Sequence, residues 1–455
     1  MEKFSVFQLL REKYPTFQFK SYQYHWENPQ KLIIQFTYSI GSEWTFSPTM
    51  EILFGENVEV QKIDIDSFIY HLGIVELISY WKATCSPEVQ FPHPLHVDEI
   101  PFWKTVFYHG LGEFFYKNGI SVSEDEFMNI TASSFDEVHP MAYPYEENTV
   151  LVPIGGGKDS SVTLYILQKN NYHVVPFIIN PSKTTLNIIH AAGISEKNAI
   201  FVRRPIDPVL LSMNEKGFLN GHIPFSAVIA FYTSLVAALA GIKHIALSNE
   251  SSANESTIPG TKINHQYSKT YEFEKLFRHF THRFLSPTTN YFSFLRPINE
   301  LQIGALFSKM PMFHSVFRSC NVGSKQGILC NLCPKCLFTH IILSPFLDPD
   351  YIQNIIGLKT FDNPSLEEEM LQLMGESPKK PFECVGTINE VRSALAYTLH
   401  EKYQVHRAPL LLSSVANRLT QDDFVLFRSL LSYFDEHHFL PPSFEQILRY
   451  ELEKL

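Results

Sequence analysis

The sequence of 455 residues predicts an α/β fold built on a parallel sheet. Strand-like and helix-like patterns alternate between residues 148 and 345, as in a parallel sheet with helices on both faces. Before this part, β patterns and helical stretches indicate an N-terminal α+β domain at 1–147. After it, mainly helical patterns indicate a helical C-terminal region at 346–455. The chain is therefore expected to have three parts.

Composition limits the kinds of partner. Hydrophobic residues make up 45% of the chain and charged residues 18%, as in a globular protein with a large core. The net charge of −10 argues against a nucleic-acid partner, because phosphate contacts need a basic surface. The longest apolar run, 227–242, is too short to span a bilayer, and the first residues do not begin a signal peptide. We therefore expect a cytoplasmic protein with no membrane partner.

The N-terminal part combines strands with helices. Alternating patterns predict strands at 32–38 and 45–54, and apolar residues at helical spacing predict helices at 70–82 and 103–118. Residues 121–147 are acidic and polar and contain prolines, which favours a linker.

Strands and helices then alternate through the central part. Strands are predicted at 150–154, 172–180, 198–202 and 243–248. Helices are predicted after residue 158 and at 206–220, 227–242 and 272–280. In the C-terminal region the predicted helices are 365–374, 388–399 and 422–434.

The most informative stretch lies between the first central strand and its helix: Gly155-Gly156-Gly157-Lys158-Asp159-Ser160-Ser161. Glycine lets backbone N–H groups face a ligand, and a helix N-terminus adds free donors and a positive dipole, so the loop is suited to phosphate. A Walker loop needs glycine at 152 and serine or threonine at 159, where this chain has Val152 and Asp159. The dinucleotide pattern Gly-x-Gly-x-x-Gly is also absent from the sequence. A plain glycine-rich turn is the alternative.

The loop resembles the PP-loop of ATP pyrophosphatases, usually Ser-Gly-Gly-x-Asp-Ser, with Gly155 in place of the first serine. This resemblance implies a PP-loop (adenine nucleotide alpha hydrolase-like) domain that uses ATP and Mg²⁺. Gly155, Gly156, Gly157, Ser160 and Ser161 would then hold phosphates. Lys158 would neutralise charge, and Asp159 would position magnesium or cap the helix.

Other polar segments are candidates for the same site. Asn249 and Glu250 follow the strand at 243–248, and ligands of parallel sheets bind at the carboxyl ends of strands. The loop that carries His265, Tyr267 and Lys269 is dense in hydrogen-bonding groups, although a solvated loop would have the same composition.

Two arginines and one predicted helix start suit anionic substrate groups. Arg296 and Arg318 could make fork-like contacts with phosphate or carboxylate, or be ordinary surface arginines. Gly386 and Thr387 precede the helix at 388–399, where they would hold an anion or form an ordinary N-cap.

Four of the six cysteines lie close together in the sequence, as Cys320, Cys330, Cys333 and Cys336. The spacing C-x9-C-x2-C-x2-C can supply four thiolates to one tetrahedral ion, which favours a structural Zn²⁺ site with no open position. Buried thiols without metal, or one reactive thiol, are the alternatives.

Taken in order, these motifs resemble the UDP-N-acetyl-muramoyl-L-alanyl-L-glutamate epimerases of bacterial peptidoglycan synthesis, over most of the chain. The resemblance implies inversion of the terminal L-glutamate of UDP-MurNAc-L-Ala-L-Glu, with ATP and Mg²⁺ consumed through an acyl-adenylate and AMP and diphosphate released. Arg296 or Arg318 would contact the substrate. Candidates for the racemising base are His265, Tyr267, Lys269, Glu250 and Cys384, of which the 265–269 loop is preferred.

Three other functions remain open from the sequence. Deazaguanine synthases have a similar loop and cysteine cluster and convert a carboxylate to an amide or nitrile. A tRNA thiolase would want a basic RNA surface, which the net charge of −10 does not favour. A non-catalytic ATP-binding scaffold would bind nucleotide and release no diphosphate. The oligomeric state is not indicated by the sequence.

Overall fold

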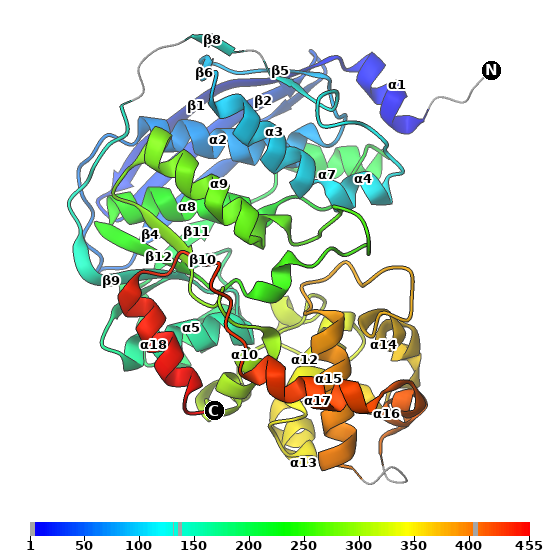
Figure 1. Ribbon diagram of the computed structural model, residues 1–455. Helices are drawn as coiled ribbons and strands as arrows, with labels where there is room; N and C mark the ends of the chain where they lie inside the picture. The colour runs from blue at the N-terminus through cyan, green and yellow to red at the C-terminus, as the bar shows by residue number, and fades with distance from the viewer. Residues whose placement is uncertain (1–4, 131, 135–138, 404–407) are drawn as a thin grey trace.

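The computed structural model describes residues 5–130, 132–134, 139–403 and 408–455 (Figure 1). The strands of its main sheet are β1 (Thr16–Asn28), β2 (Lys31–Ile40), β3 (Trp44–Phe46), β4 (Thr49–Phe54), β5 (Glu88–Gln90), β7 (Asn129–Ile130), β9 (Glu146–Pro153), β10 (His173–Ile179), β11 (Ile200–Arg203), β12 (Ile242–Leu247) and β13 (Asn290–Ser293). A separate pair is formed by β6 (Leu95–His96) and β8 (Ala132–Ser134).

The α-helices within the described residues are α1 (Val6–Lys13), α2 (Asp66–Trp81), α3 (Glu99–Gly110), α4 (Gly112–Lys117), α5 (Lys158–Lys169), α6 (Lys183–Ala191), α7 (Pro208–Glu215), α8 (Phe225–Leu239), α9 (Tyr271–Phe280), α10 (Glu300–Ser308), α11 (Pro311–His314), α12 (Pro334–Leu343), α13 (Pro349–Tyr351), α14 (Glu367–Leu373), α15 (Ile388–Glu401), α16 (Leu410–Val415), α17 (Gln421–Leu431) and α18 (Pro442–Leu452). No helix in these described ranges is long and apolar enough to cross a membrane.

The predicted parallel sheet with helices on both faces is confirmed in the central part. Strands β13, β12, β9, β10 and β11 run parallel in that order. Successive residues of β9 enter opposite cores: Leu151 packs with α2 and α8, whereas Val150 and Val152 pack with α5 and α10. This two-sided burial explains why β9 is almost wholly apolar from Val150 to Val152.

The N-terminal strands continue the same sheet. β4 pairs antiparallel with β11, and the order then runs β4, β2, β1, β5, β7, so the whole sheet is mixed rather than parallel. α2 is buried almost all round, between this half of the sheet and α8. The boundaries at 147 and 345 stay predictions, although the sheet joins the first two parts without a break. The linker predicted at 121–147 is wrong for part of its length, because β7 joins the main sheet, β8 pairs with β6 and β9 begins at Glu146, while residues 131 and 135–138 lie outside the described residues.

One predicted helix is divided in two. The pattern at 103–118 predicts a single helix, but α3 ends at Gly110 and α4 begins at Gly112. A Cβ at Gly110 would lie 2.5 Å from the ring of Pro224, so the close approach of this segment to the start of α8 needs glycine. The break directs Glu113 at the start of α4 toward the loop that carries His265.

Helices predominate after residue 345, as predicted. A third core is formed by α12, α14, α15 and α17, and it contains Phe338 of α12 and Phe427 of α17. The last helix leaves this group, and α18 returns to α5 (Figure 1). Its Phe444 and Leu448 enter the core of the parallel sheet.

Candidate active site

The glycine loop joins β9 to α5 at the carboxyl edge of the parallel strands. Gly156 has a φ of +84°, and a Cβ there would come within 2.8 Å of the Thr184 side chain. A Cβ on Gly157 would lie 3.1 Å from Ser319 Oγ, whereas one on Gly155 would have no described atom within 4 Å. The loop therefore requires glycine at Gly156 and leaves open space beside Gly155.

The start of α5 offers hydrogen-bond donors beside this space. The helix begins after Gly157, which has no side chain with which to cap it. The Lys158 N–H donates to Ser319 Oγ at 3.3 Å, and the hydroxyls of Ser160 and Ser161 donate to the Gly157 carbonyl at 3.4 and 2.9 Å. Free amides at the positive end of the helix dipole favour an anion here.

A cavity of about 250 Å³ lies over this helix end, against the last residues of β9, β10 and β12. Its polar lining includes Asp159, Ser160, Asn249, Lys269, Ser319 and Lys335, together with Ser226 and Ser248. The structure thus brings the glycine loop, the end of β12 and the 265–269 loop to one cavity. Two ammonium groups favour an anionic ligand, and the Asp159 carboxylate can accompany a cation.

Lys158 faces away from solvent and is 1% exposed. Its ammonium pairs with Asp159 and with Glu300 at the start of α10. Burial alone would lower the pKa of Lys158, but these two carboxylates raise it well above its usual range. The lysine is therefore a fixed cation beneath the loop, and it holds Asp159 at the cavity.

The polar groups that follow β12 are also held by the protein. Asn249 Nδ2 donates to Ser293 Oγ at 3.1 Å. Glu250 is buried, which raises the pKa of its carboxyl, and Lys269 is the positive charge that opposes this shift most strongly. Ser248 donates to Thr163 of α5 at 2.8 Å, so this strand end is fixed to the helix that follows the glycine loop.

Arg296 is fully buried, which is contrary to the substrate contact expected from the sequence. Its guanidinium donates to the carbonyls of Glu250, at 2.7 Å, and Lys269, and to the Glu274 carboxylate at 3.2 Å. A buried cation needs such partners, and these leave it facing protein groups rather than the cavity. Arg296 positions the two segments that carry Glu250 and Lys269.

A line of charged groups extends from the cavity through Lys269. Lys269 Nζ donates to Cys384 Sγ at 3.2 Å, and the same sulfur has a side-chain hydrogen bond with His265. His265 Nδ1 in turn bonds the Glu113 carboxylate, which also pairs with Lys117. His265, Lys269 and Cys384 are thus brought together from two distant segments.

These neighbours shift the pKa values of the line strongly. Burial would raise the pKa of the Cys384 thiol, but Lys269, Lys335 and His265 lower it well below its usual range. Burial would lower the pKa of His265, but its bonds to Cys384 and Glu113 raise it to about 9. The arrangement therefore favours a thiolate beside an imidazolium and an ammonium.

Tyr267 lies apart from this line. Its ring packs against His109 and Phe273, and its buried hydroxyl has no hydrogen-bond partner in the described part of the chain. Burial raises the pKa of this hydroxyl. The structure does not bring Tyr267 together with His265 and Lys269 as the sequence favoured, because the 3₁₀ turn Tyr267–Lys269 directs alternate side chains to different sides.

Arg318 holds its own loop. Its Nε donates to the Gly327 carbonyl at 2.7 Å, its Nη1 donates to Phe317 at 2.7 Å, and its backbone N–H donates to Gly156 at 2.8 Å. The backbone bond ties this segment to the glycine loop. The substrate contact predicted for Arg318 stays a prediction.

The start of α15 is closed by its own side chains. Thr387 Oγ1 accepts from the Glu390 N–H at 3.2 Å, and the Thr387 N–H donates to the Glu390 carboxylate at 2.5 Å. A Cβ on Gly386 would lie 2.6 Å from that carboxylate. An added anion would compete with Glu390, so the N-cap interpretation fits this helix end, and the substrate contact of Gly386 and Thr387 stays a prediction.

Cys320, Cys330, Cys333 and Cys336 bring their four sulfur atoms within 4.8 Å of one another. Cys320 and Cys333 lie 3.9 Å apart, as do Cys330 and Cys336. Backbone N–H groups of Gly323 and Leu332 donate to two of these sulfurs at 3.1 and 3.4 Å. Tetrahedral zinc with bonds of about 2.3 Å needs sulfur atoms at such spacing.

The Glu113–His265 contact predicts a pH-dependent part of the stability. Burial opposes the charged carboxylate, but His265 and Lys117 lower the pKa of Glu113 to about 2. A lowered pKa stabilises the folded protein above about pH 4.5, and this stabilisation is lost as the pH falls toward 2. Glu113→Gln should therefore cost about 2 kcal/mol at pH 6, and less as the pH falls below 4.5. Urea unfolding from pH 3 to 6 measures this, and a gap that is constant with pH would contradict it.

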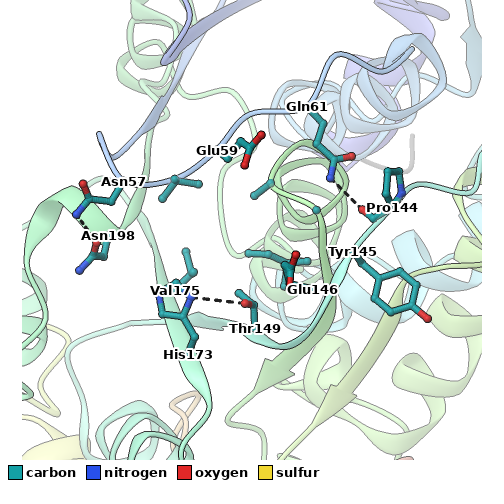
Figure 2. A pocket seen from close by; sticks show the side chains of 14 residues that line it. Asn57, Glu59, Gln61, Pro144, Tyr145, Glu146, Thr149, His173, Val175 and Asn198 are labelled. Carbon is teal, nitrogen blue, oxygen red and sulfur yellow. Dashed lines mark hydrogen bonds between the residues drawn. The ribbon is translucent and has the colours of Figure 1, made fainter.

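A larger cavity, of about 380 Å³, lies at the opposite edge of the parallel strands. Figure 2 shows its lining, with Asn57 donating to Asn198 at 2.7 Å and Gln61 donating to the Pro144 carbonyl at 2.9 Å. None of the predicted site residues is among the described residues that line it. This cavity is large enough for a ligand, but it lies apart from the charged groups described above.

Several residues of the site were not predicted from the sequence: Glu113, Glu300, Ser319, Lys335 and Glu390. Each has at least one contact with a group far away along the chain, such as Glu113 with His265 and Glu390 with Ser252. One local signal existed for Glu300, because Asn299 and Gln302 form a capping box at the start of α10 and place a carboxylate in its first turn.

Comparison with known proteins gives consistent matches. The family described as the MurL N-terminal domain matches residues 8–294, and the MurL C-terminal domain matches residues 312–423. Three similar proteins are named UDP-N-acetyl-alpha-D-muramoyl-L-alanyl-L-glutamate epimerase. That of Salinispora tropica is 32% identical over 71% of this chain and 71% of its own length. Those of a Micromonospora species and of Xanthomonas oryzae pv. oryzae are 33% and 31% identical, over 76% and 71% of this chain and 77% and 73% of their own lengths.

Proposed function

The chain belongs to the MurL epimerase family, and from this premise we propose that it inverts the terminal L-glutamate of UDP-MurNAc-L-Ala-L-Glu to D-glutamate in peptidoglycan biosynthesis. ATP and Mg²⁺ would be consumed through an acyl-adenylate, with release of AMP and diphosphate. The observation that carries this proposal is the cavity that joins the glycine loop to Lys269 and Lys335. Because both the nucleotide and the UDP-linked precursor are cytoplasmic molecules, we place the reaction in the cytoplasm.

Activation of the carboxyl group solves the chemical difficulty of this inversion. A free carboxylate makes the neighbouring Cα–H very weakly acidic, since its removal would create an adjacent dianion. Adenylation removes this charge and gives an acyl group that accepts electron density. Hydrolysis after inversion returns the acid. The proposed use of ATP thus has a chemical reason that does not depend on any one residue.

The residues fit ATP as a substrate. The backbone of Gly155 to Gly157 and the start of α5 would hold its phosphates. The space beside Gly155, where a Cβ would have no described atom within 4 Å, leaves room for a phosphate to approach the backbone. Lys269 and Lys335 would neutralise phosphate charge, and Asp159 would accompany magnesium. Lys158, fixed between Asp159 and Glu300, would support the loop from below rather than transfer a proton. We retain the PP-loop class on these grounds.

The four-cysteine cluster fits a structural zinc ion. Its sulfur spacing and its backbone N–H donors match a closed tetrahedral site with no position for substrate. Cys320 follows Ser319, whose hydroxyl accepts from the start of α5, so an ion there would stabilise one wall of the cavity. Zinc would have no chemical role in the epimerisation.

The test is an assay of UDP-MurNAc-L-Ala-L-Glu with ATP and Mg²⁺ in deuterium oxide, followed by chiral analysis of the glutamate. Diphosphate release together with α-deuterated D-glutamate is expected. Substrate without ATP is the control and should keep its L-configuration and its α-hydrogen. Diphosphate without inversion would indicate an amide-forming or thiolating enzyme, and ATP binding without diphosphate release would indicate a scaffold.

A further inference from the structure

Cys384 occupies a distinctive place in the molecule. It lies outside the four-cysteine cluster, and its sulfur is within 3.2 Å of Lys269 Nζ. Lys269 also lines the cavity at the glycine loop. Lys269 therefore spans the distance between the proposed nucleotide site and the thiol.

We propose that Cys384 is the base that removes the α-proton of the activated glutamyl residue, and that His265 and Glu113 are positioning residues that act through it. The proposal rests on the proposed function and adds to it the identity of the proton-accepting atom.

The other candidates from the sequence are less suited to accept a proton. Tyr267 faces His109 and Phe273. Lys269 is held as an ammonium, because burial is outweighed by Cys384 and Glu250, which raise its pKa. His265 is held as an imidazolium by Cys384 and Glu113, which raise its pKa to about 9 despite burial. Glu250 is buried beside Arg296 and faces Lys269. Of these five residues, Cys384 is therefore the one best suited to accept the α-proton on its sulfur.

Three positively charged groups from different elements favour the thiolate form of Cys384. Lys269 approaches from the 3₁₀ turn, His265 from the loop before it, and Lys335 from α12. Glu383, the neighbour in sequence, is an opposing carboxylate beside the thiol, and burial raises its pKa. Glu113 and Glu250 lie behind His265 and Lys269 and keep these groups charged.

The step balances without any further co-reactant except water. The thiolate sulfur forms an S–H bond as the Cα–H bond breaks, and the electron pair of that bond moves into the activated carbonyl. A proton from solvent water then reaches the opposite face of the α-carbon, and the thiol returns its proton to solvent. The Lys269 ammonium, which lines the cavity and contacts the sulfur, would balance the charge that develops on the carbonyl oxygen.

The first test compares Cys384→Ala and Cys384→Ser with the wild-type protein. Two readouts are needed: substrate-dependent exchange of labelled diphosphate into ATP, which reports adenylation, and deuterium incorporation at the glutamyl α-carbon. We expect α-deuteration and inversion to fall about 1,000-fold while diphosphate exchange stays within a few-fold of wild type. Circular dichroism of both variants checks that they are folded.

Each other outcome has a distinct meaning. Normal α-deuteration in folded Cys384→Ala would overturn the proposal, as would equal loss of adenylation and α-deuteration in both variants. A glutamyl thioester trapped on Cys384 would show that Cys384 acts as a nucleophile and not as the base. Absence of diphosphate exchange in the wild type would contradict the proposed function itself, which separates the two failures.

The positioning role has its own readout in the pH profile. His265→Gln removes the imidazolium beside the sulfur, so the acid limb of α-deuteration should move to higher pH, with a loss of about 10-fold at pH 6.5 that recovers toward pH 9. His222→Gln is the matched control, because the His222 ring lies 4.3 Å from the His265 ring and its Nδ1 lies 3.6 Å from the Glu113 carboxylate, so it removes a histidine beside the same pair, whereas of these two histidines only His265 has a hydrogen bond to the thiol. A uniform loss at all pH values in His265→Gln would contradict the positioning role.

Discussion

Lys158→Met is expected to lower the free energy of unfolding by about 3 to 5 kcal/mol. Lys158 is 1% exposed, and its ammonium pairs with Glu300, which is 3% exposed. Removal of one partner leaves the other carboxylate buried without an opposing charge, which costs much more than loss of a surface ion pair. Urea unfolding at pH 7 measures the change.

Two further variants identify its cause. Lys158→Met combined with Glu300→Gln should recover a large part of the loss, because the unpaired charge is then removed. Lys169→Met is the matched control from the other end of α5. Lys169 pairs with Glu451 at 2.9 Å, but its side chain is 43% exposed, so the loss should stay below about 1 kcal/mol. Equal losses in the two single lysine variants would contradict the explanation.

Cys333→Ser is expected to remove bound zinc and to lower the midpoint of thermal unfolding by about 10 °C or more. The wild-type protein should contain about one zinc ion per chain, as elemental analysis can measure. A strong chelator should reproduce the thermal shift in the wild type and have little effect on the variant. The physical reason is that four thiolates in one small volume repel each other unless an ion is bound between them.

Cys384→Ser is the matched control for metal content. Its thiol lies outside the cluster, so its zinc content should equal that of the wild type. Wild-type protein without zinc that is insensitive to chelators would contradict the metal assignment and leave four buried thiols. The cluster would then stabilise the protein only through the packing of Cys320, Cys333 and Cys336 in the core around α12.

Local patterns were sufficient to predict most central elements. The strands at 172–180 and 243–248 and the helix at 227–242 differ from β10, β12 and α8 by only a few residues at their ends. These elements can be predicted because their apolar runs, and the turns between them, depend on residues that are close together in the sequence. The pairing of β4 with β11 was not predictable in this way, because it joins residues about 150 positions apart through backbone bonds that leave no mark on side-chain pattern.

The same limit applies to the site. The glycine loop and the end of β12 were placed at one edge because the parallel topology dictates it. The burial of Arg296 was not predictable, since a buried arginine and an exposed arginine have the same sequence signal until their partners are known. The role of Glu113 was not predictable either. It reaches the site because the chain breaks between α3 and α4 after Gly110, whereas the sequence pattern predicts one continuous helix there.

The capping glutamate of α15 has a consequence for the order in which the protein is completed. Glu390 accepts from Ser252 Oγ at 2.6 Å and from the Glu300 N–H at 2.6 Å, while Glu300 pairs with Lys158. During synthesis, Lys158 leaves the ribosome 142 residues before Glu300, and Glu300 leaves 90 residues before Glu390. A nascent chain thus carries the whole glycine loop long before the groups beneath it are in place. The support of this loop depends on the last quarter of the chain being made.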